Sequence, residues 1–279
     1  MNILTILVLL ILTSMYSCCY ALNADYQHPN VTVRYFDSRG RAEAIRLTLA
    51  ALGIPFKEVK YARCGDNCEE GFIDWPTAKA EGIANGMLPF GQVPSTTYDG
   101  KHLVQSLAIL QYICSQNHCS ALPHEEYDVM AFVGGYNDLR SKYSKMVYDS
   151  TIWNEGSTII QDYKDTSKVW LGYLESLLKE NAFVGGEPLL NQEWGHWTWA
   201  DILAFEIFDM NIRVSPEIID QYPKLQNIAF SIARMSGVQF YLESDGRRPH
   251  QNGASAFFDN PEHPIVNPFD WTKIDSTEL

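Results

Sequence analysis

Hydrophobic and polar positions in the first third of the chain predict a small mixed sheet with two helices. Val31–Phe36 is β-branched and aromatic with a period of two, which predicts a strand. Further along, an Asp-Gly pair at Asp99-Gly100 is typical of a hairpin turn between two short strands. In chain order, the predicted elements after the first strand are a helix over 42–52, a strand at 56–61, strands at 94–97 and 102–104, and a helix over 106–115.

Beyond Pro123 the pattern changes to helices only. Trp170, Leu174, Leu177 and Leu178 mark one amphipathic helix. A second helix, marked by Ile202, Leu203, Phe205 and Phe208, is apolar on most sides and is therefore predicted to be buried. The segment Thr198-Trp199-Ala200-Asp201 precedes this helix as a capping box, with the Thr198 oxygen expected to accept from the N–H of Asp201.

The first residues of the chain are apolar and uncharged. The run from Met1 to Thr13 is shorter than the roughly 20 residues of a spanning helix, and small residues follow up to Ala21. We expect residues 1–21 to be a signal peptide, the alternative being an anchor that stays attached. The protein would then be secreted or extracellular, or held in the lumen of the endoplasmic reticulum if the final Ser-Thr-Glu-Leu acts as a retrieval signal.

Charge excludes one class of partner. The 279 residues carry a formal net charge of −13 and no run of Lys or Arg. A chain of this kind has no basic surface with which to grip nucleic acid phosphates or anionic lipid. We expect neither a nucleic acid partner nor, after removal of the leader, a membrane, so an anionic small ligand must be held by a few local donors.

The cysteines that remain after leader removal form two close pairs. These residues are Cys64, Cys68, Cys114 and Cys119. Local disulfides fit an exported protein, and spacing alone leaves their pairing open. The alternative is zinc, with His118 and His102 near Cys119, but neither spacing is that of a common zinc site, so we expect no metal. Asn30-Val31-Thr32 is a glycosylation sequon consistent with export.

Tyr35 stands at the end of the first predicted strand, where a sheet of this order places its reactive residue. Redox proteins of this kind carry paired Cys there, whereas this chain has no Cys between Leu22 and Arg63, which opposes a disulfide oxidoreductase. A phenol can donate one hydrogen bond to a thiolate. The alternative interpretation of Tyr35 alone is a structural aromatic residue of the strand.

Six segments taken together resemble glutathione transferases of the sigma class. The resemblance covers roughly residues 31–249. The order and spacing of the segments match those of the family, as do their residues. The segments are Tyr35–Arg46, Asp74-Trp75-Pro76 with Lys79, Leu88–Pro94, Leu103–Ile109, and Trp197–Asp201 with Tyr222–Leu225.

The resemblance implies an α/β thioredoxin-like domain followed by an all-α domain. We place the first at 30–118, the second at 124–246 and a tail at 247–279, whose aromatic residues either pack on the body or line a substrate pocket. It also implies a homodimer that binds glutathione as co-substrate, with attack of the thiolate on a small hydrophobic electrophile or on a peroxide oxygen in a pocket between the domains.

The same resemblance assigns roles to individual residues. Tyr35 would activate the thiol and Arg41 would support it. Asp138 would reach the γ-glutamyl amine of the glutathione bound to the other subunit, although Glu125, Glu126 and Asp128 offer other carboxylates. The remaining contacts with glutathione would come from Trp75, Lys79, Gln92, Val93, Pro94, Gln105 and Ser106.

Two other functions stay open at this stage. The same fold serves as a ligand carrier or a lens protein, and the intact set of site residues favours the enzyme over these. Relatives that isomerise prostaglandin H carry further acidic residues and a Trp on the first long helix, where this chain has Gly134, Gly135 and Lys145. Prostaglandin synthase activity is therefore not favoured.

Overall fold

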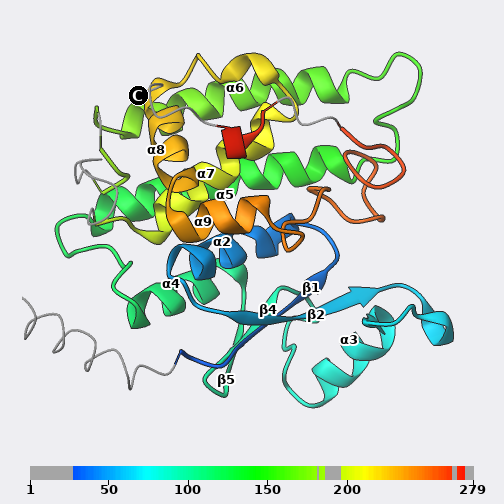
Figure 1. Ribbon diagram of the computed structural model, residues 1–279. Coiled ribbons are helices and arrows are strands. Elements are labelled where there is room, and N and C mark those ends of the chain that lie inside the picture. Colours follow the sequence, from blue (N-terminus) through cyan, green and yellow to red (C-terminus); the bar gives the residue numbers. More distant parts are fainter. Residues whose placement is uncertain (1–27, 181, 186–195, 266–268, 274–279) are drawn as a thin grey trace, which may run out of the picture.

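The computed structural model describes residues 28–180, 182–185, 196–265 and 269–273, and it shows two parts stacked on each other. A sheet with its helices forms the lower part of Figure 1, and a bundle of helices forms the upper part. The predicted leader and the final Ser-Thr-Glu-Leu lie outside the described residues. The predicted fold, a thioredoxin-like domain followed by an all-helical domain, is confirmed.

The sheet has five strands in the order β3-β2-β1-β4-β5. β1 pairs in parallel with β2, and β2 with β3, whereas β4 lies antiparallel to β1 and β5 antiparallel to β4. β1 is thus the central strand, which explains its β-branched residues: Val31 and Val33 are buried against the helices. The bounds are β1 Val31–Phe36, β2 Phe56–Ala62, β3 Phe72–Asp74, β4 Ser95–Tyr98 and β5 Lys101–Val104.

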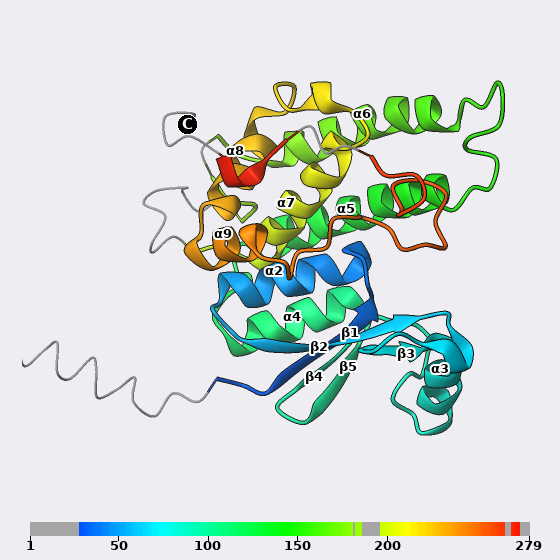
Figure 2. The ribbon, with the colours of Figure 1, turned by 45° about the vertical axis from the view of Figure 1, so that its right-hand side comes forward.

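Helices cover both faces of this sheet. α2 (Glu43–Ala51) and α4 (Ser106–Gln116) lie between the sheet and the helical bundle, as Figure 2 shows, and α3 (Trp75–Ala84) lies on the other side. The pattern of apolar positions did not predict α3, because its residues show almost no apolar face. Its start was readable in hindsight: Asp74 caps the helix by accepting from the N–H of Thr77, and Pro76 occupies the first turn.

The helical bundle is built around α7. Every residue of α7 (Trp199–Ile212) is buried, as its all-round apolar pattern predicted. The predicted capping box is present: the carboxylate of Asp201 accepts from the N–H and the hydroxyl of Thr198, and the Thr198 side-chain oxygen accepts from the N–H of Asp201 and also from that of Ala200. Around α7 stand α5 (Glu126–Val147), α6 (Ile159–Leu177), α8 (Pro223–Ala233) and α9 (Ser236–Glu243).

Short 3₁₀ turns complete the regular structure. They lie at Gly40–Ala42, Gly65–Asn67, Pro216–Ile218 and Trp271–Lys273. Within the described part of the chain, no helix combines the length and apolar character that a membrane span requires.

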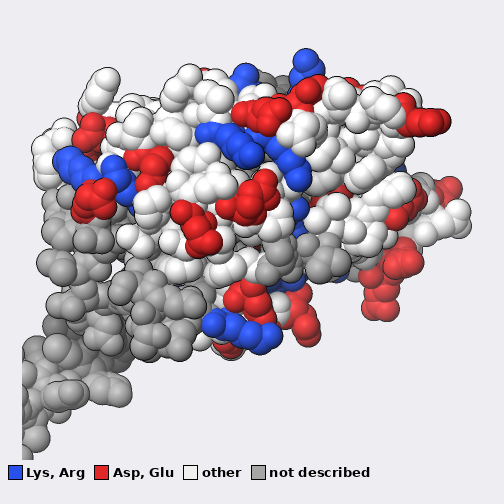
Figure 3. Space-filling view, turned by 90° about the horizontal axis from the view of Figure 1, so that it is seen from above, with Lys and Arg blue, Asp and Glu red and all other residues white. Residues whose placement is uncertain are grey.

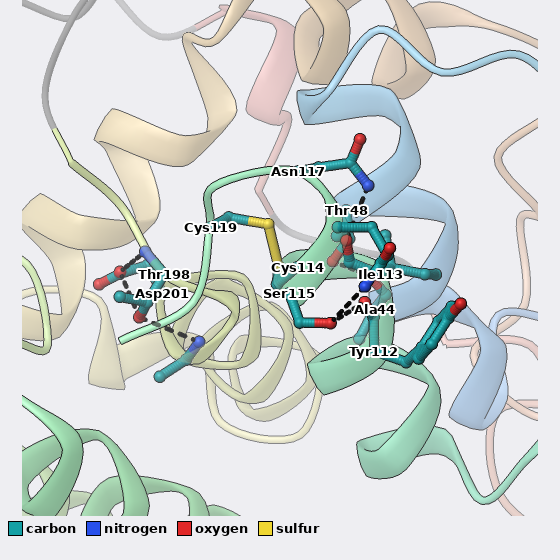
Figure 4. Close-up of a disulfide and its surroundings, with 12 residues drawn as sticks. Ala44, Thr48, Tyr112, Ile113, Cys114, Ser115, Asn117, Cys119, Thr198 and Asp201 are labelled. Atoms are coloured by element: carbon teal, nitrogen blue, oxygen red, sulfur yellow. Dashed lines mark hydrogen bonds between the residues drawn. A yellow bond between two sulfur atoms is a disulfide. The ribbon is translucent and has the colours of Figure 1, made fainter. Parts of the chain in front are cut away.

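Two disulfides join the cysteines within their close pairs. Cys64 bonds to Cys68 in the loop after β2, and Cys114 bonds to Cys119 just beyond α4. Figure 4 shows the second bond beside the start of α7, where the N–H of Trp199 donates to the carbonyl of Cys119 over 3.1 Å. The disulfide fixes the segment between the two parts and leaves Cys119 no thiolate for the zinc alternative with His118 and His102.

The segment after α9 returns to the sheet and then to the bundle. In Figure 1 it runs, orange to red, past the end of β1 and back to α7 and α8. Phe258 and Trp271 are each 2% exposed, and the Trp271 ring packs on Phe205. Burial of the tail against the body is therefore confirmed for these two aromatic residues.

Buried charges hold the sheet domain, the bundle and the tail together. Asp209 of α7 accepts from Arg39 and from Arg247, each over 2.9 Å, and from the indole N–H of Trp271. Glu43 of α2 accepts from the hydroxyl of Tyr241 on α9. Burial alone would raise the pKa of Asp209, but the surrounding guanidinium groups of Arg247, Arg39 and Arg213 lower it below its ordinary value. Asp209 is thus an ionised carboxylate at the junction of three chain segments.

On the outer face of the bundle the charged residues lie on the surface, unlike the buried ion pairs between the segments. Figure 3 shows Lys and Arg interspersed with Asp and Glu among uncharged side chains on this face. Charges of both signs therefore alternate among the described residues seen on this face.

We expect Asp209→Asn to lower the free energy of unfolding by about 3 kcal/mol near neutral pH, because two buried guanidinium groups lose their counter-charge. The lowered pKa also predicts the sign of the pH dependence. The contribution of Asp209 is fully present above the unfolded pKa of about 3.9 and is lost progressively as pH falls below that value and through the lower folded pKa. Urea unfolding between pH 3 and 7 should therefore be less steeply pH-dependent in the variant. Asp220→Asn, at an exposed position, is the control, and equal pH profiles for the two variants would contradict this role.

Candidate functional site

Two cavities adjoin each other where β1 ends. The larger has a volume of about 450 Å³ and includes Tyr35, and the smaller has about 370 Å³ and includes Gln105 and Ser106. Arg41 lines both. The larger cavity also takes residues from α5 and from the tail, so it lies between the sheet domain and the bundle, where the electrophile pocket was expected.

Tyr35 is held by the turn that follows its own strand. Its hydroxyl oxygen accepts a hydrogen bond from the backbone N–H of Arg41 over 3.1 Å. Gly40 allows this approach: its φ is +46°, and a Cβ there would lie 2.5 Å from the Tyr35 ring. Both the left-handed backbone and the close contact require glycine at this position. The turn therefore fixes the phenol with its oxygen already accepting one hydrogen bond.

The smaller cavity brings together five of the residues expected to bind glutathione. Gln92, Val93, Pro94, Gln105 and Ser106 all line it. The Val93-Pro94 peptide bond is cis. Gln105 has a φ of +69° and precedes α4, which has no side-chain cap. The first N–H groups of α4 are thus available at the cavity, where the positive end of the helix dipole favours an anion.

Trp75 and Lys79 are placed outside this lining. Trp75 is 6% exposed and packs against Phe36 and Tyr61, with ring centroids 5.4 and 5.3 Å apart. Lys79 is exposed one turn further along α3 and lies over Gly91, next to Gln92. Their contact with the glycyl end of glutathione stays a prediction.

α5 presents other residues to the cavities than the sequence singled out. Asp138 is exposed, while its neighbours Asn137 and Ser141 line the smaller cavity. Of the alternative carboxylates upstream, Glu125 is buried and accepts from the N–H of Leu122. Asp138 therefore remains free to act toward a second subunit, and Asn137 and Ser141 join the candidate site.

The larger cavity contains several residues that sequence reasoning missed. Arg140, Ser144 and Tyr148 come from α5 or its end, and the tail contributes residues 252–255 with Pro261. The larger cavity is not lined by any of the aromatic residues that the tail offered as candidates, so that alternative was wrong for this cavity; these residues are Phe257, Phe258, Phe269 and Trp271. The helical spacing of Asn137, Arg140, Ser141 and Ser144 was visible in the sequence, but nothing in it showed which face of α5 meets the sheet domain.

The tail is bonded directly to the turn that carries Arg41. The N–H of Arg39 donates to the carbonyl of His250, and the N–H of Gly40 donates to that of Gln251, over 3.0 and 2.8 Å. Asp259 anchors the tail through an ion pair with Arg213 of 2.6 Å, buried on both sides. The tail thus supports the Tyr35 turn as well as the wall of the larger cavity.

Chemically, the arrangement combines an anion site with a hydrogen-bond donor. A ligand anchored at the start of α4 and along 92–94 would extend toward Arg41, the residue shared by both cavities. A phenol whose oxygen already accepts from Arg41 can use its own proton to donate to an anion. The larger cavity beside it, walled partly by aromatic rings, offers space for a second molecule.

Two family models match the chain. "Glutathione S-transferase, N-terminal domain" matches residues 31–115 and "Glutathione S-transferase, C-terminal domain" matches residues 137–245, together more than half of the chain. Among curated relatives, a glutathione S-transferase of Plasmodium falciparum is 27% identical over 76% of this chain and 95% of its own length. Glutathione S-transferase 3 of Gallus gallus is 28% identical over 77% of this chain and 86% of its own. The solved Pi-class glutathione S-transferase of Onchocerca volvulus has a TM-score of 0.62 at 25% identity, covering 81% of this chain and 99% of that one.

Gly40→Ala should destabilise the protein more than an ordinary glycine replacement. At both Gly40 and Gly53 an alanine must adopt a positive φ, which costs about 1 kcal/mol. Only at Gly40 would the added methyl group meet the Tyr35 ring, since nothing lies within 4 Å at Gly53. We expect Gly40→Ala to cost about 1–3 kcal/mol more than Gly53→Ala in urea unfolding. Equal costs would show that the ring moves aside freely and that the turn does not fix it.

Proposed function

Because the chain belongs to the glutathione S-transferase family and is an enzyme with glutathione as co-substrate, we propose that it joins the glutathione thiolate to small hydrophobic electrophiles, with Tyr35 stabilising the thiolate. The sigma-like segment around Tyr35 and Arg41 supports this assignment. Glutathione would lie in the smaller cavity and the electrophile in the larger one.

One observation carries the proposal, namely the hydrogen bond from the Arg41 N–H to the Tyr35 oxygen. Because that oxygen accepts from the backbone, the phenolic O–H is directed by the same turn. Within the described residues, no hydrogen bond of the Tyr35 O–H to a protein acceptor accompanies this contact. The donor is thus available to a sulfur atom bound beside it.

The energy required is within reach of this geometry. A free thiol has a pKa of about 8.5, so only several per cent is ionised at neutral pH. Lowering that pKa by one unit takes about 1.4 kcal/mol of differential stabilisation. A hydrogen bond to a charged group contributes about 1.5–3 kcal/mol, so one phenol donor can ionise much of the bound thiol.

The rival function is a glutathione-binding carrier without significant turnover. It predicts that glutathione binds in the smaller cavity but that Tyr35 has no effect on reactivity. The residues that line that cavity would serve either function. The enzyme and the carrier therefore differ in the effect of Tyr35 on reactivity and not in their affinity for glutathione.

We expect Tyr35→Phe to reduce kcat/KM with an aryl halide by about 10–100-fold, since one hydrogen bond to the thiolate is lost. The pKa of bound glutathione, measured by difference ultraviolet spectroscopy, should rise by about one to two units. Tyr61→Phe is the matched control, because it removes another phenol from the wall of the same cavity. Retention on immobilised glutathione without turnover in the parent protein would favour the carrier, and equal turnover in Tyr35→Phe would remove Tyr35 from the mechanism.

We further propose that the protein acts as a homodimer through the exposed face of α5. Tyr127 and Met130 are 82% and 48% exposed, and helical spacing puts them on the same face as Asn137 and Ser141 at the smaller cavity. Phe90, which is 62% exposed, lines that cavity as well. Apolar side chains exposed beside a site in this way favour contact with a second copy, which would bring Asp138 of the partner subunit toward the bound γ-glutamyl group.

Met130→Glu should convert the dimer to a monomer in sedimentation velocity experiments and weaken glutathione binding several-fold, because the partner's Asp138 leaves with its subunit. Phe240→Glu is the control, since Phe240 is 76% exposed on α9. A monomeric variant with unchanged glutathione affinity would contradict the role of Asp138, and a dimeric one would contradict the interface.

Export is the remaining part of the proposal. Disulfides at two places and an exposed Asn30 in a sequon support maturation in an oxidising compartment. N-terminal sequencing of the product from transfected cells should begin at Leu22 in the medium. Retention of Met1 in the product would contradict cleavage, and recovery only from the endoplasmic reticulum would favour the retrieval signal.

A further inference from the structure

The larger cavity carries more positive than negative charge. Arg41, Arg63 and Arg140 line it, and Asp37 is the single carboxylate among its described lining residues. The chain as a whole has a net charge of −13, so three arginines around one cavity run against the overall composition. This local excess calls for a ligand-based explanation.

Arg140 is buried in the wall of this cavity. Its side chain is 3% exposed, and its carboxylate neighbour is Glu206, at 3.5 Å from the Nε atom. That separation is too long for a good hydrogen bond, and both Arg140 Nε and Glu206 Oε1 lack a hydrogen-bond partner among the described residues. Glu206 is also engaged by Tyr136, whose hydroxyl donates to it over 2.8 Å. Arg140 therefore keeps bonding capacity that the protein leaves unused.

The other charges of the cavity do not cancel the arginines. Asp37 is already paired with Arg248 at 2.6 Å and lies 3.7 Å from Lys60. Arg63 is exposed at the rim and, within the described part of the chain, forms no ion pair, and the same holds for Arg41. The opening of the cavity is thus cationic, and in its wall Arg140 shares the carboxylate of Glu206 with the hydroxyl of Tyr136.

The rest of the wall is aromatic or weakly polar. The rings of Phe36, Tyr61, Phe72 and Tyr148 face it. Rings suit a flat or apolar body, whereas guanidinium groups suit a carboxylate. One molecule that satisfies both has an apolar body and an acidic end.

We propose that the electrophile taken by this cavity is an amphipathic acid, an activated alkene or arene that carries a carboxylate, and that Arg63 and Arg140 bind that carboxylate. This inference rests on the proposed transferase function and names the substrate class of its second site. Arg63 would attract the anion at the rim, and Arg140 would hold it against the bundle.

For an activated alkene conjugated to a ketone the reaction balances without another reactant. The glutathione thiol first releases its proton to solvent; its sulfur then forms a bond to the β-carbon while the alkene electron pair shifts toward the carbonyl oxygen, and solvent returns one proton to the α-carbon of the resulting enolate. The carboxylate takes no part in the bond changes. Its task is to place the β-carbon next to the sulfur.

Binding of unreactive ligands tests the inference apart from turnover. The ligands are 4-(4-carboxymethylphenyl)butan-2-one and its methyl ester, saturated ketones that differ only in the charge at one end. We expect the acid to bind the purified protein about tenfold more tightly than the ester in isothermal titration calorimetry. The preference should shrink as salt is raised from low to high concentration, because the rim is exposed.

Variants identify the arginines that create this preference. Arg63→Ala changes an exposed residue and should lower the acid-to-ester ratio by about threefold or more. Arg140→Gln should lower it further, and Arg140→Lys, which keeps the charge near Glu206, should retain much of it. Lys57→Ala removes an exposed cation from the neighbouring strand outside the cavity and is the control.

Equal binding of acid and ester to the parent protein would overturn the inference, as would an unchanged ratio in both Arg63→Ala and Arg140→Gln. Failure of the transferase function has a different signature. The unsaturated ester, 4-(4-methoxycarbonylmethylphenyl)but-3-en-2-one, tests conjugation without the anionic group. If the protein conjugates this unsaturated ester while the saturated acid and ester bind equally well, the transferase function stands and only the proposed preference for an acidic substrate is wrong.

Discussion

The carboxylate of Asp209 is the point at which the three segments that form the site meet. It is contributed by α7 of the bundle and accepts from Arg39 of the turn after β1 and from Arg247 beyond α9. Buried ion pairs add little net stability compared with apolar packing, but an unmatched partner is strongly unfavourable. The interaction therefore selects one relative position of sheet domain, bundle and tail, because any other leaves a charge buried alone.

That position determines the chemistry of the site. The Arg39 side chain is held by Asp209 and its backbone N–H by the carbonyl of His250, so this residue of the turn is fixed through both its side chain and its backbone. Gly40 and Arg41 then fix the Tyr35 phenol. A residue deep in the helical bundle thus sets the orientation of a hydroxyl at the end of a strand, through a turn that touches both domains.

The sequence allowed the elements to be predicted better than the surfaces at which they meet. β1, the helices α2 and α4 and the capping box of α7 depend on local patterns of apolar and capping residues, and these were recovered to within a residue or two. α3 was missed because its apolar positions do not form a stripe. Arg140 and the tail residues of the larger cavity were missed because the face that α5 turns toward the sheet depends on packing between segments far apart in the chain. Tyr35 and the lining of the smaller cavity were found through a resemblance in spacing, since a single Tyr or Gln carries no such information.

The bonds between the turn at Arg39-Gly40 and the carbonyls of His250 and Gln251 also have a meaning for biosynthesis. Domains of a growing chain fold largely in the order in which they leave the ribosome. β1 and its turn emerge more than two hundred residues before their partners in the tail. A nascent chain can therefore form the sheet early, but the turn that holds the Tyr35 phenol gains its support from the tail only when translation reaches its final stretch.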